Sequence, residues 1–285
     1  MAEVTTYELQ TKVSEFLTPE APRLPTDSVR RSAVEVLTRT VRKGWRTYLV
    51  GGFLRDVIVR PHSSGPRDFD VVVEGCSWDE LREVFIDIVS GHNRFGGLSL
   101  RRQTEVPGQN NAPAHELDFD VWRLEDTWAV RHFELPQTIE SFVRTPFLNI
   151  DSIAISIRPG DDYLAVFEHG FFDALKGRYV EVNQTSNPYP VLCAVRGLIM
   201  ASTLNFVVGP KLAAFVYELA TNVALEEFVA AQVGHYGHVR SSREQLARWI
   251  SDIRSQLEAG REDVRLTTEK AADGSIPEDA GYLNG

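Results

Sequence analysis

Residues 48–73 read YLVGGFLRDVIVRPHSSGPRDFDVVV, and this stretch decides the fold. A short apolar run ends at Gly51 and Gly52, a helix-like segment follows, and a polar loop leads to an Asp-x-Asp motif and three valines. The pattern predicts a strand, a tight turn into a helix, a loop and a second strand. Because side chains alternate between the two faces of a strand, Asp68 and Asp70 should share one face.

Two carboxylates held in this way can bridge a pair of divalent cations about 3.5–4 Å apart, as in phosphoryl transfer. Hard cations such as Mg²⁺ prefer oxygen ligands. The glycine pair leaves backbone N–H groups at the start of a helix, where the helix dipole also attracts phosphate. Arg55, about one helical turn further on, adds a positive charge. Taken alone, the Asp-x-Asp motif is explained by an exposed strand end and the Gly-Gly pair by a plain turn. Their combination in one strand–turn–helix–loop–strand unit favours a catalytic site.

The stretch resembles the head domain of the tRNA nucleotidyltransferases (CCA-adding enzymes) and bacterial poly(A) polymerases, whose motif is Gly-Gly-x-x-Arg-Asp followed by Asp-x-Asp. The resemblance implies an α+β fold, in which a mixed, polymerase-β-like nucleotidyltransferase sheet with flanking helices precedes a small all-helical neck domain. It also implies that Gly51, Gly52 and Arg55 contact the nucleotide, and that Asp68 and Asp70 hold Mg²⁺ or Mn²⁺. The chain is identified as a divergent member.

Composition places the chain among ordinary globular proteins, with 285 residues of which 43% are hydrophobic and 25% charged. No apolar run approaches the roughly 20 residues of a membrane span, and the N-terminus lacks the features of a signal peptide. We therefore expect no membrane association. Cys76 and Cys193 are the only cysteines and have no metal-ligand spacing, so we expect the reducing environment of the cytoplasm. Because the net charge is −10, any basic groove for RNA must be local.

The chain is expected to divide into four parts, because proline-rich and charged stretches separate segments of different periodicity. These are an N-terminal arm (1–26), a nucleotidyltransferase head domain (27–185), a helical neck-like domain (186–259) and a largely disordered tail (260–285).

Periodicity also predicts the elements within these parts. In the head we expect helices at about 28–42 and 77–91, and strands at about 47–50, 68–73, 95–102, 115–124 and 147–157. In the neck we expect three helices, at about 190–208, 209–233 and 241–260.

A third carboxylate for the metal site could come from the strand predicted at 115–124. Asp118 and Asp120 again share one face of that strand, and a solvent-facing edge explains them equally well. The resemblance favours Asp118, because Trp122-Arg123 matches the family's aromatic–arginine pair a fixed distance beyond its acidic residue. Asp120 is the alternative.

Base recognition is where the chain departs from the family. The resemblance covers about residues 30–210, but the family's base-reading Glu-Asp-x-x-Arg falls on SNPYP at 186–190. Asn187, whose amide can hydrogen-bond a base, and Arg196 are the remaining candidates for nucleotide contact.

These observations predict a metal-dependent nucleotidyltransferase that transfers a nucleoside monophosphate from an NTP, ATP or CTP, to an acceptor hydroxyl. By resemblance, the acceptor is the 3′ end of tRNA or another RNA. The alternatives are a divergent enzyme that modifies a protein or small molecule, and a catalytically inactive nucleotide-binding module. The intact pair Asp68 and Asp70 favours an enzyme, because a non-catalytic protein has no need to hold two like charges close together. The sequence does not indicate the oligomeric state.

Overall fold

The computed structural model describes residues 5–17, 26–59, 68–93, 95–104, 115–157 and 164–267. The chain divides into two compact units, residues 1–187 and residues 188–285. The predicted proline-rich lead-in, the polar loop before Asp68, the turn-rich loop before His115 and the tail beyond residue 267 lie outside the described residues. No described helix is long and apolar enough to cross a membrane.

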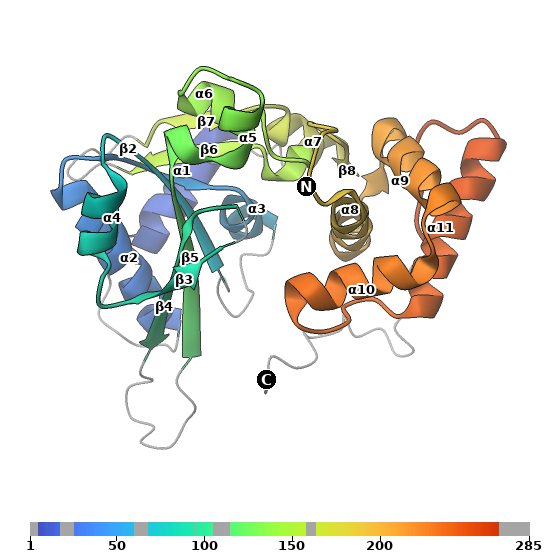
Figure 1. The fold of residues 1–285 in the computed structure, drawn as a ribbon. Helices are drawn as coiled ribbons and strands as arrows, with labels where there is room; N and C mark the ends of the chain where they lie inside the picture. Colours follow the sequence, from blue (N-terminus) through green and yellow to red (C-terminus); the bar gives the residue numbers. More distant parts are fainter. Residues whose placement is uncertain are drawn as a thin grey trace. The chain divides into compact units, whose positions relative to one another are not determined.

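The first unit is built on a seven-stranded sheet with the order β3-β4-β5-β2-β1-β6-β7 (Figure 1). The central pair, β2 and β5, is parallel, and the other pairs are antiparallel, which makes the sheet mixed as predicted. The strands are β1 (Arg46–Val50), β2 (Asp68–Glu74), β3 (Val89–His92), β4 (Leu98–Thr104), β5 (His115–Arg123), β6 (Ile153–Ile157) and β7 (Val166–Glu168).

Helices flank this sheet. They are α1 (Thr6–Leu17), α2 (Thr26–Arg42), α3 (Gly52–Val59), α4 (Trp78–Val84), α5 (Trp128–His132), α6 (Ile139–Phe142) and α7 (Phe171–Gly177). Two 3₁₀ turns, η1 (Leu124–Asp126) and η2 (Asn149–Asp151), and the short strand β8 (Tyr179–Val180) complete the unit. A mixed sheet with flanking helices is the predicted fold class, and it is confirmed.

One face of the sheet packs against α1 and α3 through aromatic rings. The Phe69 ring lies 4.8 Å from Phe53 and 5.2 Å from Phe119, measured between ring centroids. Leu9 and Val13 of α1 are fully buried. Residues 6–17 of the predicted arm therefore form a helix that belongs to the core of this unit.

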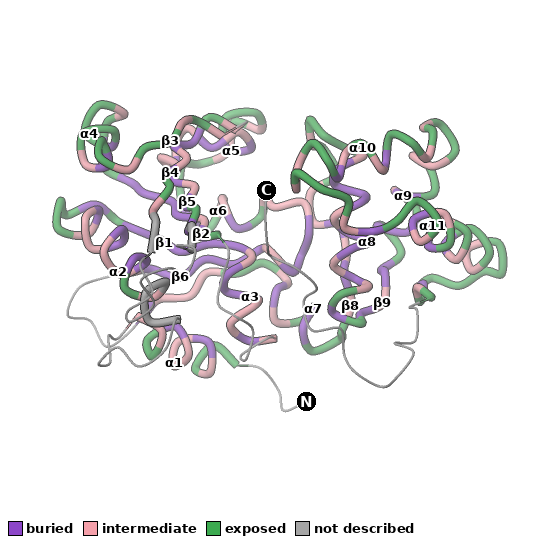
Figure 2. Tube along the Cα trace, turned by 90° about the horizontal axis from the view of Figure 1, so that it is seen from below, coloured by how far each residue is buried: buried purple, intermediate pink, exposed green. Residues whose placement is uncertain are grey.

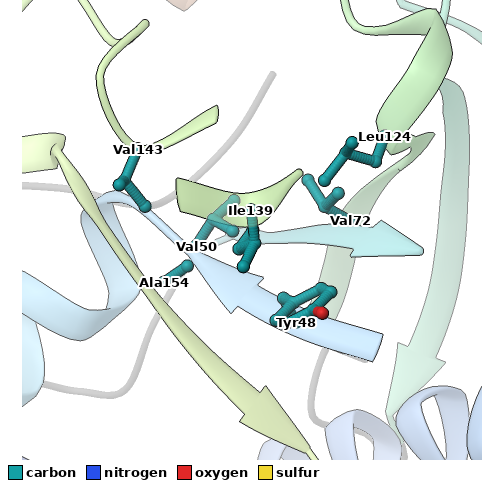
Figure 3. Packing of buried hydrophobic residues seen from close by; sticks show 7 residues of the cluster. All are labelled: Tyr48, Val50, Val72, Leu124, Ile139, Val143 and Ala154. Atoms are coloured by element: carbon teal, nitrogen blue, oxygen red, sulfur yellow. The ribbon is translucent and has the colours of Figure 1, made fainter. Parts of the chain in front are cut away.

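The opposite face carries a second apolar cluster beneath α6 (Figure 3). Its members come from β1, β2, β6, η1 and the α6 region, and they are Tyr48, Val50, Val72, Leu124, Ile139, Val143 and Ala154. Trp122 packs against this cluster while remaining partly exposed. β2 buries residues on both faces and β5 buries Leu117, Phe119 and Val121 on the face toward α1 and α3, so the carboxylates on these strands are held on a rigid support. Figure 2 shows the buried course of the chain through the middle of this unit.

Two elements of the first unit are shorter than predicted. The helix expected over 77–91 begins with a capping box between Ser77 and Glu80 but ends at Val84. Beyond it the chain turns and joins the sheet edge as β3, where backbone pairing with β4 replaces helical bonds. The strand expected from residue 147 starts only at Ile153. Before Ile153, residues Asn149–Asp151 form a 3₁₀ turn. The Asn149 side chain accepts a hydrogen bond from the Glu181 N–H, and this local contact takes the place of strand pairing in the sheet.

The second unit is helical, as predicted, and contains α8 (Pro190–Leu204), α9 (Pro210–Asn222), α10 (Leu225–Tyr236), α11 (Arg243–Glu258) and the short strand β9 (Val207–Val208). The single helix expected over 209–233 is two helices, because Val223 and Ala224 adopt extended backbone angles that end α9 and cap α10. Gly197 lets α8 and α9 approach closely, since a Cβ there would lie 2.9 Å from Leu212 Cδ1.

Part of the predicted disordered tail is ordered against this unit. Val264 is fully buried and pairs with Val208 in an isolated bridge. Trp249 Nε1 donates to Thr267 O at 3.2 Å, and Thr267 N donates to Asp252 Oδ2 at 2.7 Å. Residues 260–267 therefore extend the helical unit beyond its predicted end at 259.

Candidate active site

The glycine turn joins β1 to α3. Gly51 has a φ of +71°, a conformation that L side chains rarely adopt, and its N–H donates to Ile153 O at 3.1 Å. Its carbonyl accepts from Leu54 N at 3.1 Å and so closes the first turn of α3. A Cβ at Gly52 would lie 3.3 Å from Arg55 Nη2. The local geometry therefore favours glycine at both positions, at Gly51 for its backbone angle and at Gly52 for the close approach of Arg55.

Arg55 is buried beside this turn, with 6% of its surface exposed. Its Nη1 donates to Asp151 Oδ1 at 2.5 Å and its Nε to Asp56 Oδ1 at 2.8 Å. Burial by itself lowers the Arg55 pKa, but the charges of Asp151 and Asp56, with a smaller contribution from Asp68, outweigh it and raise the pKa overall. Arg55, expected to contact a nucleotide, is thus a permanent cation held in place by two carboxylates.

Four carboxylates lie together on β2 and β5. These strands pair in parallel with Asp68 opposite Asp118 and Asp70 opposite Asp120. Because side chains two residues apart share a face, all four project from the same side of the sheet. Asp68 and Asp118 are exposed, whereas Asp70 and Asp120 are partly buried. The structure therefore brings together every carboxylate that the sequence predicts for the metal site.

Asp70 is the carboxylate next to the glycine turn. It pairs with Val50, the residue before Gly51, across β1 and β2. A Cβ at Gly51 would lie 3.6 Å from Asp70 Oδ2. The predicted phosphate and metal sites are therefore neighbours.

The two candidates for the third carboxylate have different surroundings. Asp118 forms an ion pair with Arg101 Nε at 3.1 Å, and both side chains are 53% exposed. Asp120 accepts a hydrogen bond from Ser99 Oγ at 2.8 Å. Burial raises the Asp120 pKa, the hydrogen bond from Ser99 opposes this, and the charges of Asp68 and Asp118 raise it further, so that the net shift is upward.

Among the described residues no three histidine, cysteine or acidic side chains are arranged to hold one metal ion. Two of the four carboxylates engage β4 instead, Asp118 through Arg101 and Asp120 through Ser99. The donors are all carboxylate oxygens, the ligand type that suits Mg²⁺ and Mn²⁺. The residue set therefore fits a hard cation, provided that one of these two side chains turns toward Asp68 and Asp70.

The two residues proposed to contact the base lie in different units. Asn187 is the last residue of the first unit and Arg196 lies on α8 of the second, and both are partly buried. Their contact with a nucleotide stays a prediction. Sequence reasoning missed Asp151 and Ser99 as partners of site residues, because each is far from its partner in the chain and no local motif marks the contact.

No family model and no curated protein sequence matches the chain. Among solved structures, a CCA-adding enzyme in complex with CTP superposes with a TM-score of 0.57 at 17% identity, covering 87% of this chain and 55% of that one. A CCA-adding enzyme with ATP gives 0.56 at 16% identity, covering 85% and 54%.

A third structure, a tRNA nucleotidyltransferase complexed with a primer tRNA and an incoming ATP analog, gives a TM-score of 0.52 at 21% identity, covering 80% of this chain and 61% of that one. The chain thus spans little more than half the length of the enzymes it matches. Over that span, the protein has the fold of the CCA-adding tRNA nucleotidyltransferases, at 16–21% sequence identity.

Proposed function

We propose that the protein is a metal-dependent nucleotidyltransferase that transfers a nucleoside monophosphate from ATP or CTP to the 3′ hydroxyl of tRNA or another RNA. The observation that carries this proposal is the position of Asp70, which shares a sheet face with three other carboxylates and lies beside the Gly51 turn. The fold shared with enzymes solved with CTP, ATP and tRNA agrees with it. The first unit is the proposed head domain and the second the proposed neck.

The turn would bind the phosphates of the NTP through the first N–H groups of α3. Gly51 N–H is used by Ile153, and the N–H groups of Leu54 and Arg55 return to Gly51 O. Those of Gly52 and Phe53 are the ones that helix geometry leaves for an anion. Arg55 contributes positive charge behind the turn.

Asp68, Asp70 and a third carboxylate would hold Mg²⁺ or Mn²⁺. Bound there, the cation would lower the pKa of the acceptor hydroxyl and offset charge on the phosphates. For the third position the contacts support Asp120, which is opposite Asp70 and partly buried, over Asp118, which is opposite Asp68 and held by Arg101 at the surface. The family resemblance supports Asp118, so the two are to be separated by experiment.

A second candidate function is transfer to a protein or small-molecule acceptor. It is favoured by the absence of the base-reading motif at 186–190 and by the net charge of −10, which is unusual for a protein that grips RNA. A catalytically inactive nucleotide-binding module is the third possibility.

The test is to incubate the purified protein with each labelled NTP, Mg²⁺ or Mn²⁺, and total cellular RNA or lysate. Label in RNA that depends on the metal is the expected result. Label in the protein or small-molecule fraction would support the second candidate instead. Metal-dependent nucleotide binding without any incorporation would leave only the inactive module.

A further inference from the structure

A surface hollow of about 430 Å³ lies beyond the end of β5 and is lined by Phe95, Asp126, Trp128, Arg131 and His132. Four of these come from η1 and α5, which follow β5 directly (Figure 1), and Phe95 comes from the turn between β3 and β4. The hollow is separate from the carboxylates and from the glycine turn. It combines aromatic rings with groups of both charges.

The chemistry of the hollow matches a nucleotide. Trp128 and His132 are stacked, with ring centroids 4.6 Å apart and planes inclined by 15°. An aromatic surface of this kind can stack an unpaired base, whatever its identity. Arg131 is 68% exposed and lies 3.5 Å from Asp126, measured from Nη1 to Oδ1. The guanidinium can therefore bind a phosphate, and the carboxylate can accept from a base amino group.

The lining is held in place by its surroundings. Asp126 Oδ2 lies 2.9 Å from Arg123 Nη1, which anchors the carboxylate from its other side. Asn93 Oδ1 accepts from Phe95 N at 3.0 Å and from Gly97 N at 2.9 Å, which fixes the turn that carries Phe95. A fixed lining reduces the entropy lost when a ligand binds.

The hollow lies in line with the proposed catalytic groups. Trp122 is two residues beyond Asp120 on β5, so both side chains project from the same sheet face. The turn that carries Phe95 closes on Trp122, because a Cβ at Gly97 would overlap Trp122 Nε1. Along β5 the order is therefore the two carboxylates, then Trp122, then the η1 and α5 residues that line the hollow, and the glycine turn lies at the carboxylate end.

We propose that this hollow is the acceptor subsite and binds a base, with its adjoining phosphate, near the 3′ end of single-stranded RNA. The inference rests on the proposed function, since it assigns the acceptor of the same site. The glycine turn ends β1, whereas the hollow follows β5, and β2 with its carboxylates lies between those strands. With the triphosphate at the glycine turn, an RNA strand whose base occupies the hollow would reach the carboxylates along β5, past Trp122.

The test measures RNA binding by the full chain without NTP and in the presence of EDTA, using the anisotropy of a short fluorescent single-stranded RNA. Trp128→Ala should weaken RNA binding about tenfold, as expected for the loss of one stacked base, and Trp128→Phe should retain most of the affinity. Arg131→Glu, at an exposed position where folding is not at risk, should also weaken binding and reduce the salt dependence by about one ion.

The matched control is Arg42→Glu, at an exposed arginine where α2 ends, which should bind RNA as the wild type does. ATP binding should be the same in all of these proteins. RNA binding unchanged by both hollow variants, or lost equally in the control, would overturn the assignment. Loss of ATP binding in Trp128→Ala and Arg131→Glu would overturn it too, because the hollow would then serve the incoming nucleotide.

The outcome also separates this inference from the proposed function. A protein that adds labelled nucleotide to RNA, but whose RNA binding is unchanged by Trp128→Ala and Arg131→Glu, would retain the proposed function and lose the acceptor subsite. A protein that binds RNA through the hollow, yet incorporates no nucleotide with either metal, would retain the subsite as an RNA site and lose the function.

Discussion

Arg55 Nη1 donates to Asp151 Oδ1 at 2.5 Å, although the two residues are 96 positions apart in the chain. The contact joins α3 to η2 and holds the guanidinium against Gly52. An arginine that the motif marks as a nucleotide contact is therefore also part of the structure of the turn. Asp56 and Asp151 orient the guanidinium, and in the proposed function its charge would act on a bound phosphate from behind the backbone.

Arg55→Ala should lower the free energy of unfolding by roughly 3–5 kcal/mol, because it leaves the largely buried Asp151 without its counter-charge. Urea denaturation measures the change. Arg101→Ala removes a half-exposed ion pair with Asp118 and should cost about 1 kcal/mol or less. Similar losses for the two variants would contradict the role given to Arg55.

Gly51→Ala should destabilise the protein by about 1–2 kcal/mol and also weaken NTP binding, because φ is +71° and the new methyl group faces Asp70. Gly44→Ala is the matched control. Its φ is +79°, but a Cβ there meets nothing within 4 Å. Both variants should lose similar stability by thermal unfolding, and only Gly51→Ala should lose affinity in an ATP titration. If both variants lost affinity for ATP, the loss would come from lower stability in general and not from the Gly51 turn.

Asp70→Asn should abolish metal-dependent incorporation of labelled nucleotide while the protein stays folded. Removing one of four neighbouring carboxylates relieves repulsion, so the midpoint of thermal unfolding should not fall. Asp79→Asn, at an exposed position in the first turn of α4, removes a charge elsewhere and should leave incorporation unchanged. Normal turnover by Asp70→Asn would end the assignment of this site as a nucleotidyltransferase centre.

Asp120→Asn and Asp118→Asn separate the two candidates for the third carboxylate. If Asp120 serves the metal, its variant should lose at least about a hundredfold in turnover, the scale at which single groups stabilising a transition state act. Asp118→Asn should then change turnover little, because it alters a surface ion pair. Steady-state kinetics at saturating Mg²⁺ measure both, and the reverse ranking would assign the role to Asp118, as the family resemblance implies.

The raised pKa of Asp120 predicts a dependence of stability on pH. An acid with a higher pKa in the folded than in the unfolded chain binds more protons when folded. Its contribution to the free energy of unfolding therefore falls as pH rises from the unfolded pKa, about 3.9, through the folded one. Asp120→Asn has no such carboxyl group and does not lose this contribution. The free energy of unfolding of the variant, minus that of the wild type, should therefore be greater at pH 7 than at pH 4.

Urea denaturation of both proteins at the two pH values measures that difference. Asp79→Asn, treated in the same way, corrects for removing one negative charge from a chain with a net charge of −10. A difference for Asp120→Asn that is the same at both pH values, once corrected, would show that this carboxylate is not destabilised by burial.

Local pattern predicted the elements around the site well. The strand, glycine turn and helix at 46–59 are confirmed, as are β2 and β5, because each depends on alternation, helical spacing or glycine chemistry within a few residues. Local pattern failed to predict where two helices end. The helix from Ser77 is cut short by pairing of β3 with β4, and the helix from Gly209 breaks at Val223.

The sequence by itself determined that acidic side chains would share a strand face and that a glycine turn would open a helix, since both follow from periodicity and backbone freedom. Only the tertiary structure decided which carboxylates meet. The parallel register placed Asp70 opposite Asp120, and folding brought Asp151 to Arg55. Such pairings are set by how strands and turns far apart in the chain pack together, and no local pattern encodes that.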